Sequence, residues 1–424
     1  MIGCLRYGTG FETLRERDDH VRSHNRPSKC PEHRCFYREV GFANERTLNQ
    51  HISLCHTDPP FNRFVFPKFR KPPPPAADEL KRFREAIRRE DLGLLRDMIH
   101  TNGSLRGQLS PGSLTGLGYA ASHGKLESVR CLLECGCNIG PVSDRGTALH
   151  VACHSKKTDV VQLLLSNSTS EEVNEKDKKG RTPLSFLVDL DTNDTVRLIW
   201  VFLAHVGVEV DAKDNNGQTP LSLAASKGSA GVVKLFLDHG GGVDVNTKDN
   251  EGRTPLSLAA SKGSVGVVKL FLDHGGGVDV NTKDNEGRTP LSLAASEGFV
   301  SVVKLFLEHS GEVDVNAKDN KGRTPLSWAA GSGKWSPHVV SVVKMLLEQG
   351  KVDVDAKDDA GRTPLSWAAS TGTVDVIKLF LEHGEGVDVN AEDNKGRTPL
   401  AWAMARSESY KMAGAKLLVE YGGW

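Results

Sequence analysis

Two cysteines and two histidines near the start of the chain have the spacing of a metal-binding site. Four residues separate Cys30 from Cys35, fifteen residues follow, and four more separate His51 from His56. Thiolate and imidazole ligands at such spacings are typical of a tetrahedral zinc site. We therefore expect these four residues to bind one zinc ion, with Cys55 as an alternative to His56 for the fourth position.

Apolar residues between the ligands predict a small fold around this site. Phe42 precedes Leu48 by six residues, and Leu48 precedes His51 by three. With this spacing a short helix covers a very small core and presents both histidines to the metal. Residues 26–57 thus resemble the classical C2H2 zinc finger, which implies a ββα fold. Zinc binding is worth about 10 kcal/mol or more to such peptides, so we expect this segment to be unfolded without metal.

A second, degraded copy precedes this finger. Cys4, Phe11 and His20 each lie 31 residues before their counterparts in the finger. Arg17 occupies the leucine position, and the opening cysteine of this copy would precede the first residue of the chain. We expect residues 1–25 to be a degenerate or truncated finger.

The resemblance to C2H2 fingers also implies where DNA would be read. The family's contacting positions fall on Asn44, Thr47 and Gln50. All three are polar, but none is the arginine that most often reads guanine. One finger spans only about three base pairs. The sequence therefore leaves nucleic-acid binding open without requiring it.

The rest of the chain is organised as a repeat. Thr-Pro-Leu recurs with spacings of 35 to 39 residues, and a fixed period in this range is the signature of a solenoid. The seven copies begin at Thr182, Thr219, Thr254, Thr289, Thr324, Thr363 and Thr398. Two degraded copies, near Thr147 and Leu117, bring the number of units to nine.

One unit, residues 251–283, indicates how each copy folds. Thr254 suits a helix N-cap, and Pro255 suits the first helical position, where the missing N–H costs nothing. A short helix with small residues follows, then a break at Gly263, a second apolar helix and a glycine-rich loop. Helices this short do not stand alone, because nucleation is costly and one face stays bare until a neighbour covers it. The units must therefore stack.

The pattern T-P-L-x-x-A-A-x-x-G, followed by a V-V-K-L helix and a D-V-N loop, resembles the ankyrin repeat. The resemblance covers residues 113–424, about nine units, and implies an all-α repeat solenoid that binds protein partners. Residues 78–112 can be aligned with one unit and carry additional charged residues, which predicts an N-terminal capping unit. The family's histidine after Thr-Pro-Leu is serine in most units and survives as His150, so the hydrogen-bond network there must be arranged differently.

A ladder of aspartates and arginines recurs in the turns between units. It could serve as a recognition surface, although turn chemistry and solvation also explain it. The aspartates are Asp214, Asp249, Asp284, Asp319, Asp358 and Asp393, and the arginines are Arg253, Arg288, Arg323, Arg362 and Arg397.

Of four tryptophans in the array, one is a candidate for a partner contact. Trp328, Trp367 and Trp402 occupy a position after Thr-Pro-Leu that is apolar in every unit, which predicts packing between repeats rather than ligand stacking. Trp335 differs, because it lies in a four-residue insertion between the two helices of its unit. An extra loop with an aromatic side chain is a candidate contact site. The irregular repeat at 186–200 is another.

Composition and motifs exclude several other classes of function. The 54 Lys and Arg residues balance the 54 Asp and Glu residues. No phosphate-binding loop, catalytic carboxylate pair or nucleophile–base arrangement is present, so we expect no enzyme and no small-molecule substrate. No apolar stretch approaches the roughly 18 residues of a membrane span, and no signal peptide opens the chain. We expect an intracellular protein of the cytoplasm or nucleus that is not secreted and does not contact membranes.

The sequence thus predicts a degenerate finger at 1–25, a zinc finger at 26–57, a proline-rich linker at 58–77, a capping unit at 78–112 and an ankyrin array at 113–424. The expected function is that of a protein–protein interaction scaffold or adaptor with a zinc-binding head. The alternative is a DNA-binding transcriptional regulator, in which the finger contacts DNA and the array recruits partners.

Overall fold

Two compact units divide the chain, at residues 1–73 and 74–424, and the described residues belong to the second. The computed structural model describes residues 77–106, 114–143, 146–190, 195–239, 242–274, 277–309, 312–333, 336–383, 386–405 and 411–424. The predicted zinc ligands Cys30, Cys35, His51 and His56, the predicted DNA-contacting residues Asn44, Thr47 and Gln50, and Trp335 lie outside these ranges.

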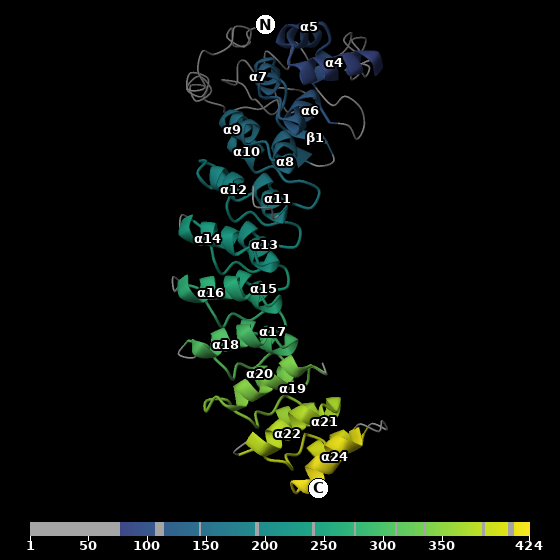
Figure 1. Ribbon diagram of the computed structural model, residues 1–424, viewed down its shortest axis with the longest axis vertical. Coiled ribbons are helices and arrows are strands. Elements are labelled where there is room, and N and C mark those ends of the chain that lie inside the picture. The colour runs from purple at the N-terminus through teal and green to yellow at the C-terminus, as the bar shows by residue number, and fades with distance from the viewer. Residues whose placement is uncertain are drawn as a thin grey trace, which may run out of the picture. The chain divides into compact units, whose positions relative to one another are not determined.

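Pairs of helices stack in chain order through residues 77–424 (Figure 1). The first members of the pairs, here called inner helices, are α4 (Ala77–Arg89), α6 (Gly116–His123), α8 (Ala148–His154), α11 (Pro183–Leu190), α13 (Pro220–Lys227), α15 (Pro255–Ser261), α17 (Pro290–Glu297), α19 (Pro325–Ala330), α21 (Pro364–Thr371) and α23 (Pro399–Met404). The second members, here called outer helices, are α5 (Leu92–Thr101), α7 (Leu126–Glu134), α9 (Thr158–Asn167), α12 (Thr195–Leu203), α14 (Ala230–His239), α16 (Val265–His274), α18 (Val300–Glu308), α20 (Pro337–Leu347), α22 (Val374–His383) and α24 (Lys411–Glu420).

The remaining regular elements are short. A 3₁₀ helix spans Gly103–Arg106, and α10 spans Ser170–Val173. Strand β1 (Pro141–Ser143) pairs antiparallel with β2 (Gly146–Thr147). The all-α repeat solenoid expected from the sequence is therefore confirmed for the residues that the structure describes. None of the helices in these ranges is long and apolar enough to cross a membrane.

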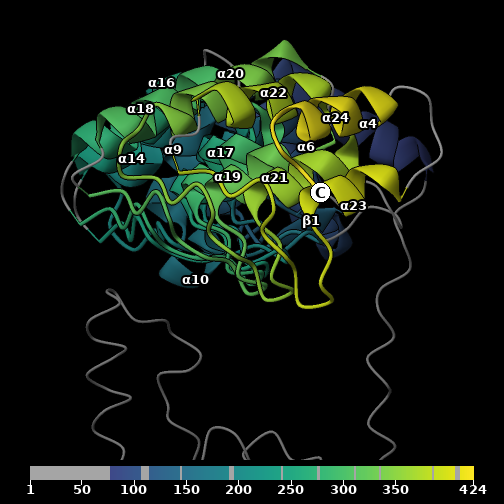
Figure 2. The same ribbon diagram turned by 90° about the horizontal axis from the view of Figure 1, so that it is seen from below.

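Three layers are visible along the stack (Figure 2). The outer helices form one layer, the inner helices form the next, and the loops between units form the third. Each inner helix contacts the inner helix of the following unit, and most outer helices do likewise. Each unit between the first and last described pairs therefore has two neighbours, and its stability depends on the interfaces with them.

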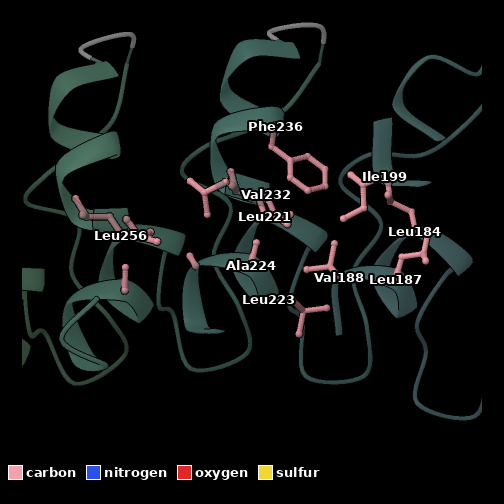
Figure 3. Close-up of a cluster of buried hydrophobic side chains, with 14 of the residues drawn as sticks. Leu184, Leu187, Val188, Ile199, Leu221, Leu223, Ala224, Val232, Phe236 and Leu256 are labelled. Atoms are coloured by element: carbon pink, nitrogen blue, oxygen red, sulfur yellow. The ribbon is translucent and has the colours of Figure 1, made fainter. Parts of the chain in front are cut away.

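The core is built from small and branched residues shared between adjacent units (Figure 3). Leu221, Ala224 and Phe236 are fully buried, in a cluster that also holds Ile199 of the preceding unit and Leu256 of the following one (Figure 3). Alanines on the inner helices let neighbouring helices approach closely, while the leucines and phenylalanine fill the space toward the outer layer. Burial of about 25 cal/mol per Å² of apolar surface makes this shared core the main source of stability.

The start of the inner helices from α11 onward follows from the Thr-Pro-Leu sequence. The Thr254 hydroxyl accepts a hydrogen bond from the Ser257 amide at 3.2 Å, and Pro255 occupies the first turn. Both groups satisfy or remove donors that a helix leaves unpaired at its N-terminus. The same N-cap recurs at the other Thr-Pro-Leu units from Thr219 to Thr398, which confirms the role predicted for this motif.

Loops of successive units are joined by hydrogen bonds. The Asn285 amide donates to the Glu251 carbonyl at 2.9 Å, and the Asn285 side chain donates to the Asn250 carbonyl at 3.0 Å. This approach requires Gly252, whose φ is +76° and whose added Cβ would lie 2.3 Å from Oδ1 of Asn285. The loop layer is thus a continuous hydrogen-bonded surface, and the candidate site lies on it.

Candidate interaction surface

Five of the loops between units contain a buried aspartate, and this aspartate organises the turn that follows it. Oδ1 of Asp358 accepts hydrogen bonds from the Ala360 and Arg362 amides at 2.9 and 2.8 Å, and its Oδ2 accepts from Nε of Arg362 at 3.2 Å. Asp249, Asp284, Asp319 and Asp393 have the same partners in their own loops.

The five aspartate side chains are at most 2% exposed. The prediction that these aspartates organise the turns is confirmed. The prediction that they are solvated is wrong, because each carboxylate is buried behind the arginine and bonds to it instead of to water. At Asp393, burial by itself raises the pKa, but hydrogen bonds from two backbone amides and the Arg397 guanidinium outweigh it and hold the pKa below its usual value. The carboxylate is therefore ionised when it binds the arginine.

Three tryptophans bind the same carboxylates. The indole Nε1 donates to Oδ2 of the aspartate nine residues earlier, at 3.1 Å for Trp328, 3.1 Å for Trp367 and 3.2 Å for Trp402. A tryptophan is donor-only at this nitrogen, so the bond fixes the orientation of the ring. The flat face of each ring lies against the arginine of its own unit.

Arginines and indoles alternate across the last three units that carry tryptophan at this position. Guanidinium carbons lie 3.6, 3.4 and 3.8 Å from the ring centroids within the pairs Arg323–Trp328, Arg362–Trp367 and Arg397–Trp402. Between units, Arg323 lies 5.9 Å from Trp367 and Arg362 lies 5.6 Å from Trp402. Both distances are within the range of cation–π attraction. We call these six residues the Arg–Trp ladder.

Trp367 and Trp402 pack against the core, as the sequence predicted, but the partial exposure of the three rings was not predicted. Leu223, Leu258 and Leu293, at the same position in earlier units, are 2–7% exposed, whereas the three indoles are half-buried. Tryptophan is larger than leucine, so part of each residue stays exposed while the ring face stacks on arginine. Aromatic and arginine side chains are enriched at protein interfaces.

A model of the family "Ankyrin repeats (3 copies)" matches residues 117–200, 190–284, 274–358 and 334–423. This chain belongs to the ankyrin repeat family. The chain is 34% identical over 100 residues to mouse Rabankyrin-5 and 36% identical over 86 residues to human Rabankyrin-5. These alignments cover 23% and 20% of this chain, but only 8% and 7% of the relatives.

A third relative is covered over most of its own length. Human Protein phosphatase 1 regulatory subunit 27 is 31% identical over 117 residues, which is 27% of this chain and 74% of that protein. The chain thus spans only a small part of Rabankyrin-5 but about three quarters of this regulatory subunit.

Charge at the loop tips changes along the array. Nη1 of Arg253 pairs with Glu251 at 2.9 Å, and Nη1 of Arg288 pairs with Glu286 at 3.5 Å. In the three units of the Arg–Trp ladder, the residue two before the arginine is instead Lys321, Ala360 or Lys395. The ladder therefore lacks the exposed glutamate that neutralises the arginine in the preceding units. Sequence reasoning missed this change, although comparison of the turn residues would have revealed it.

His150 occupies the site where the family's histidine was expected. Its Nδ1 lies 3.0 Å from the Thr147 hydroxyl, and its Nε2 lies 3.0 Å from the Arg181 carbonyl of the next unit. In the serine units the corresponding hydroxyl contacts only its own N-cap threonine, for example at 3.1 Å between Ser292 and Thr289. The expected rearrangement is confirmed, and the serine units lose a bond between units.

One further aromatic residue is exposed in the irregular repeat that the sequence singled out. Trp200 on α12 is 61% exposed, and Val206 after the same helix is 91% exposed. The described residues contain no group of three or more histidine, cysteine or acidic side chains arranged to hold a metal ion. The predicted zinc ligands lie in residues 1–76, which are outside the described ranges.

Proposed function

We propose that this chain is a non-enzymatic scaffold or adaptor whose ankyrin array binds protein partners. The observation that carries the proposal is the Arg–Trp ladder, in which half-buried indoles and guanidinium groups continue across three units of a rigid loop surface. Such residues anchor protein interfaces because they combine apolar contact with directional hydrogen bonds. A relative named as a regulatory subunit fits a role without catalysis of its own.

Affinity capture with the full chain, followed by cross-linking and mass spectrometry, tests this function. We expect proteins that bind in stoichiometric amounts and cross-link to lysines within residues 77–424. Partners that cross-link only to residues 1–76, or no stoichiometric partner, would contradict an interaction role of the array.

We also infer that the head binds zinc through Cys30, Cys35, His51 and His56. The spacing of the ligands and the apolar residues between them support this inference. Elemental analysis of the purified full chain should find one equivalent of zinc per chain, and Cys35→Ser should abolish it. Cys4→Ser is the matched control and should retain the metal. Zinc-free protein after purification without chelator would argue against the site.

DNA binding remains the alternative use of the head, through Asn44, Thr47 and Gln50. Mobility-shift assays with the zinc-loaded full chain at physiological salt separate the two functions. A sequence-specific shift that is lost on chelation would favour the regulator, and the absence of a shift at micromolar protein would exclude it. We place the scaffold in the cytoplasm or nucleus, which fluorescence microscopy of the tagged chain can test.

A further inference from the structure

Each arginine of the Arg–Trp ladder has one hydrogen-bonding edge bound to a buried carboxylate. The Nε of Arg323, Arg362 and Arg397 donates to the buried aspartate at 2.9–3.2 Å. Their Nη1 atoms have no carboxylate partner among the described residues, and the three side chains are 15%, 21% and 40% exposed. The ladder therefore presents oriented cationic donors beside indole edges.

Two preceding units show what fits against such an edge. Oε2 of Glu251 lies 2.9 Å from Nη1 of Arg253, and this glutamate side chain is 66% exposed. Glu286 makes the equivalent contact with Arg288 at 3.5 Å and is 61% exposed. A carboxylate thus reaches Nη1 from the solvent side while the buried aspartate holds the other edge.

We propose that the Arg–Trp ladder binds an extended acidic segment of a protein partner. Partner carboxylates occupy, at Arg323, Arg362 and Arg397, the position that Glu251 occupies at Arg253. Apolar parts of the segment cover the exposed edges of Trp328 and Trp367. The inference rests on the proposed scaffold function and assigns it a surface and a ligand class.

Charge complementarity favours this occupant. Lys321 and Lys395 add positive charge at the two ends of the ladder, whereas Asp359 next to Ala360 makes the middle less basic. Charge-assisted hydrogen bonds to an already oriented guanidinium are stronger than bonds between neutral groups and require little further ordering of the arginine. Arginine already covers the indole faces, so a ligand can reach only the ring edges. Aliphatic side chains suit such edges better than nucleic-acid bases, which would need a free face for stacking.

The overall charge of the array disfavours a nucleic acid at the same place. Residues 78–424 contain 41 Lys and Arg against 46 Asp and Glu, a net charge of 41 − 46 = −5. Binding to a phosphate backbone depends on many neutralised phosphates. A peptide with a few carboxylates needs only the local cationic edges.

The test is selection of random linear peptides on the immobilised full chain, followed by fluorescence anisotropy with the enriched peptides. We expect enrichment of aspartate and glutamate among apolar residues. The double variant Lys321→Glu and Lys395→Glu introduces glutamate at the position that Glu251 and Glu286 occupy in their own units, so the fold tolerates it. It should weaken binding at least about tenfold, because an internal carboxylate now competes for Nη1 and like charges repel the ligand.

Lys304→Glu with Lys378→Glu is the matched control. Both lysines lie on outer helices and are more than half exposed. Their replacement changes the net charge by the same amount as the replacement of Lys321 and Lys395. This control should bind the peptides within about twofold of the unmodified chain, because its charges lie on another layer. Unchanged thermal melting of both variants confirms that they are folded.

Three results would overturn the proposal: enriched peptides without acidic bias, equal affinity for both double variants, or competition by oligothymidylate at lower concentration than by the acidic peptides. Peptides that bind equally to both variants would place partner binding elsewhere on the array. The scaffold function would then stand without the ladder, whereas the absence of any protein partner in the capture experiment would refute the scaffold itself.

Discussion

The indole Nε1 of Trp367 donates to Oδ2 of Asp358 at 3.1 Å, and the same oxygen accepts a hydrogen bond from Nε of Arg362 at 3.2 Å. One buried carboxylate therefore orients both the aromatic ring and the cation stacked on it. Because the aspartate also caps two amides of the turn, loop conformation and surface chemistry are controlled by a single side chain. The ladder is consequently preorganised before any partner arrives.

Replacing this carboxylate should be costly. Asp358→Ala leaves two amides, an indole N–H and a guanidinium without their acceptor, and we expect a loss of about 3 kcal/mol of unfolding free energy. Asp214→Ala is the matched control, since Asp214 accepts from two amides but has Gln218 instead of arginine. It should cost about 1 kcal/mol. Urea titrations fitted with a nearest-neighbour model measure both, and equal losses would refute the special role of Asp358.

The asparagines of the D-V-N loops suggest a stabilising substitution. Oδ1 of Asn246 accepts from the Asp279 amide at 2.9 Å, while its Nδ2 donates to the Gly277 carbonyl at 2.6 Å. Asp211 occupies the same position one unit earlier and accepts from the Asp244 amide, but its buried Oδ1 has no partner. Asp211→Asn restores a donor and should stabilise the array by about 1 kcal/mol. The reverse change, Asn246→Asp, should destabilise it, and a loss of stability in both variants would contradict this account.

The same site should make stability depend on pH. Burial raises the pKa of Asp211 above its ordinary value of 3.8. The folded state therefore holds the proton more tightly than the unfolded state, so this contribution is complete below pH 3.8 and is lost as the pH rises through the folded pKa. Unfolding free energies measured across that range should converge for Asp211→Asn and the unmodified chain at low pH, and separate as the pH rises. A constant difference would exclude the titration.

His150 should stabilise the contact between its unit and the next. His150→Ser removes the bond to the Arg181 carbonyl, and we expect a loss of about 1 to 2 kcal/mol at neutral pH. Burial lowers the pKa of His150 below 6.5. Its contribution is thus present above pH 6.5 and falls as the pH drops below that value, because the unfolded state then binds the proton more readily. Hydrogen exchange of α8 and α11 amides at neutral and acidic pH should show this difference, and exchange that is unchanged in the variant would contradict it.

Two glycines should respond to alanine in opposite directions. Gly252→Ala places a Cβ against Asn285 at a positive φ and should cost at least about 2 kcal/mol. Gly231 lies within α14, and an added Cβ there meets nothing within 4 Å. Gly231→Ala should therefore stabilise the array by about 0.5 to 1 kcal/mol. Urea titrations compare the two, and similar effects would mean that the loop rearranges freely.

Much of the array was predictable, because its signals are local. Thr254 and Pro255 determine where a helix begins from their own chemistry, and the 35-residue period predicts that each unit covers the next. The requirement for Gly252 was less visible, since the group that approaches it belongs to a loop 33 residues later. The predicted zinc ligands Cys30 and His51 remain predictions from spacing alone.

The sequence by itself determined the repeat family, where the inner helices with Thr-Pro-Leu begin, and the positions of the aspartates, arginines and tryptophans. Only the tertiary structure decided that Asp319 is buried, that Trp328 is half-buried and that Arg323 lies between successive indoles. Exposure and stacking depend on how loops and inner helices of neighbouring units meet. Residues some 35 positions apart come together there, and a leucine and a tryptophan at the same position fill that space differently.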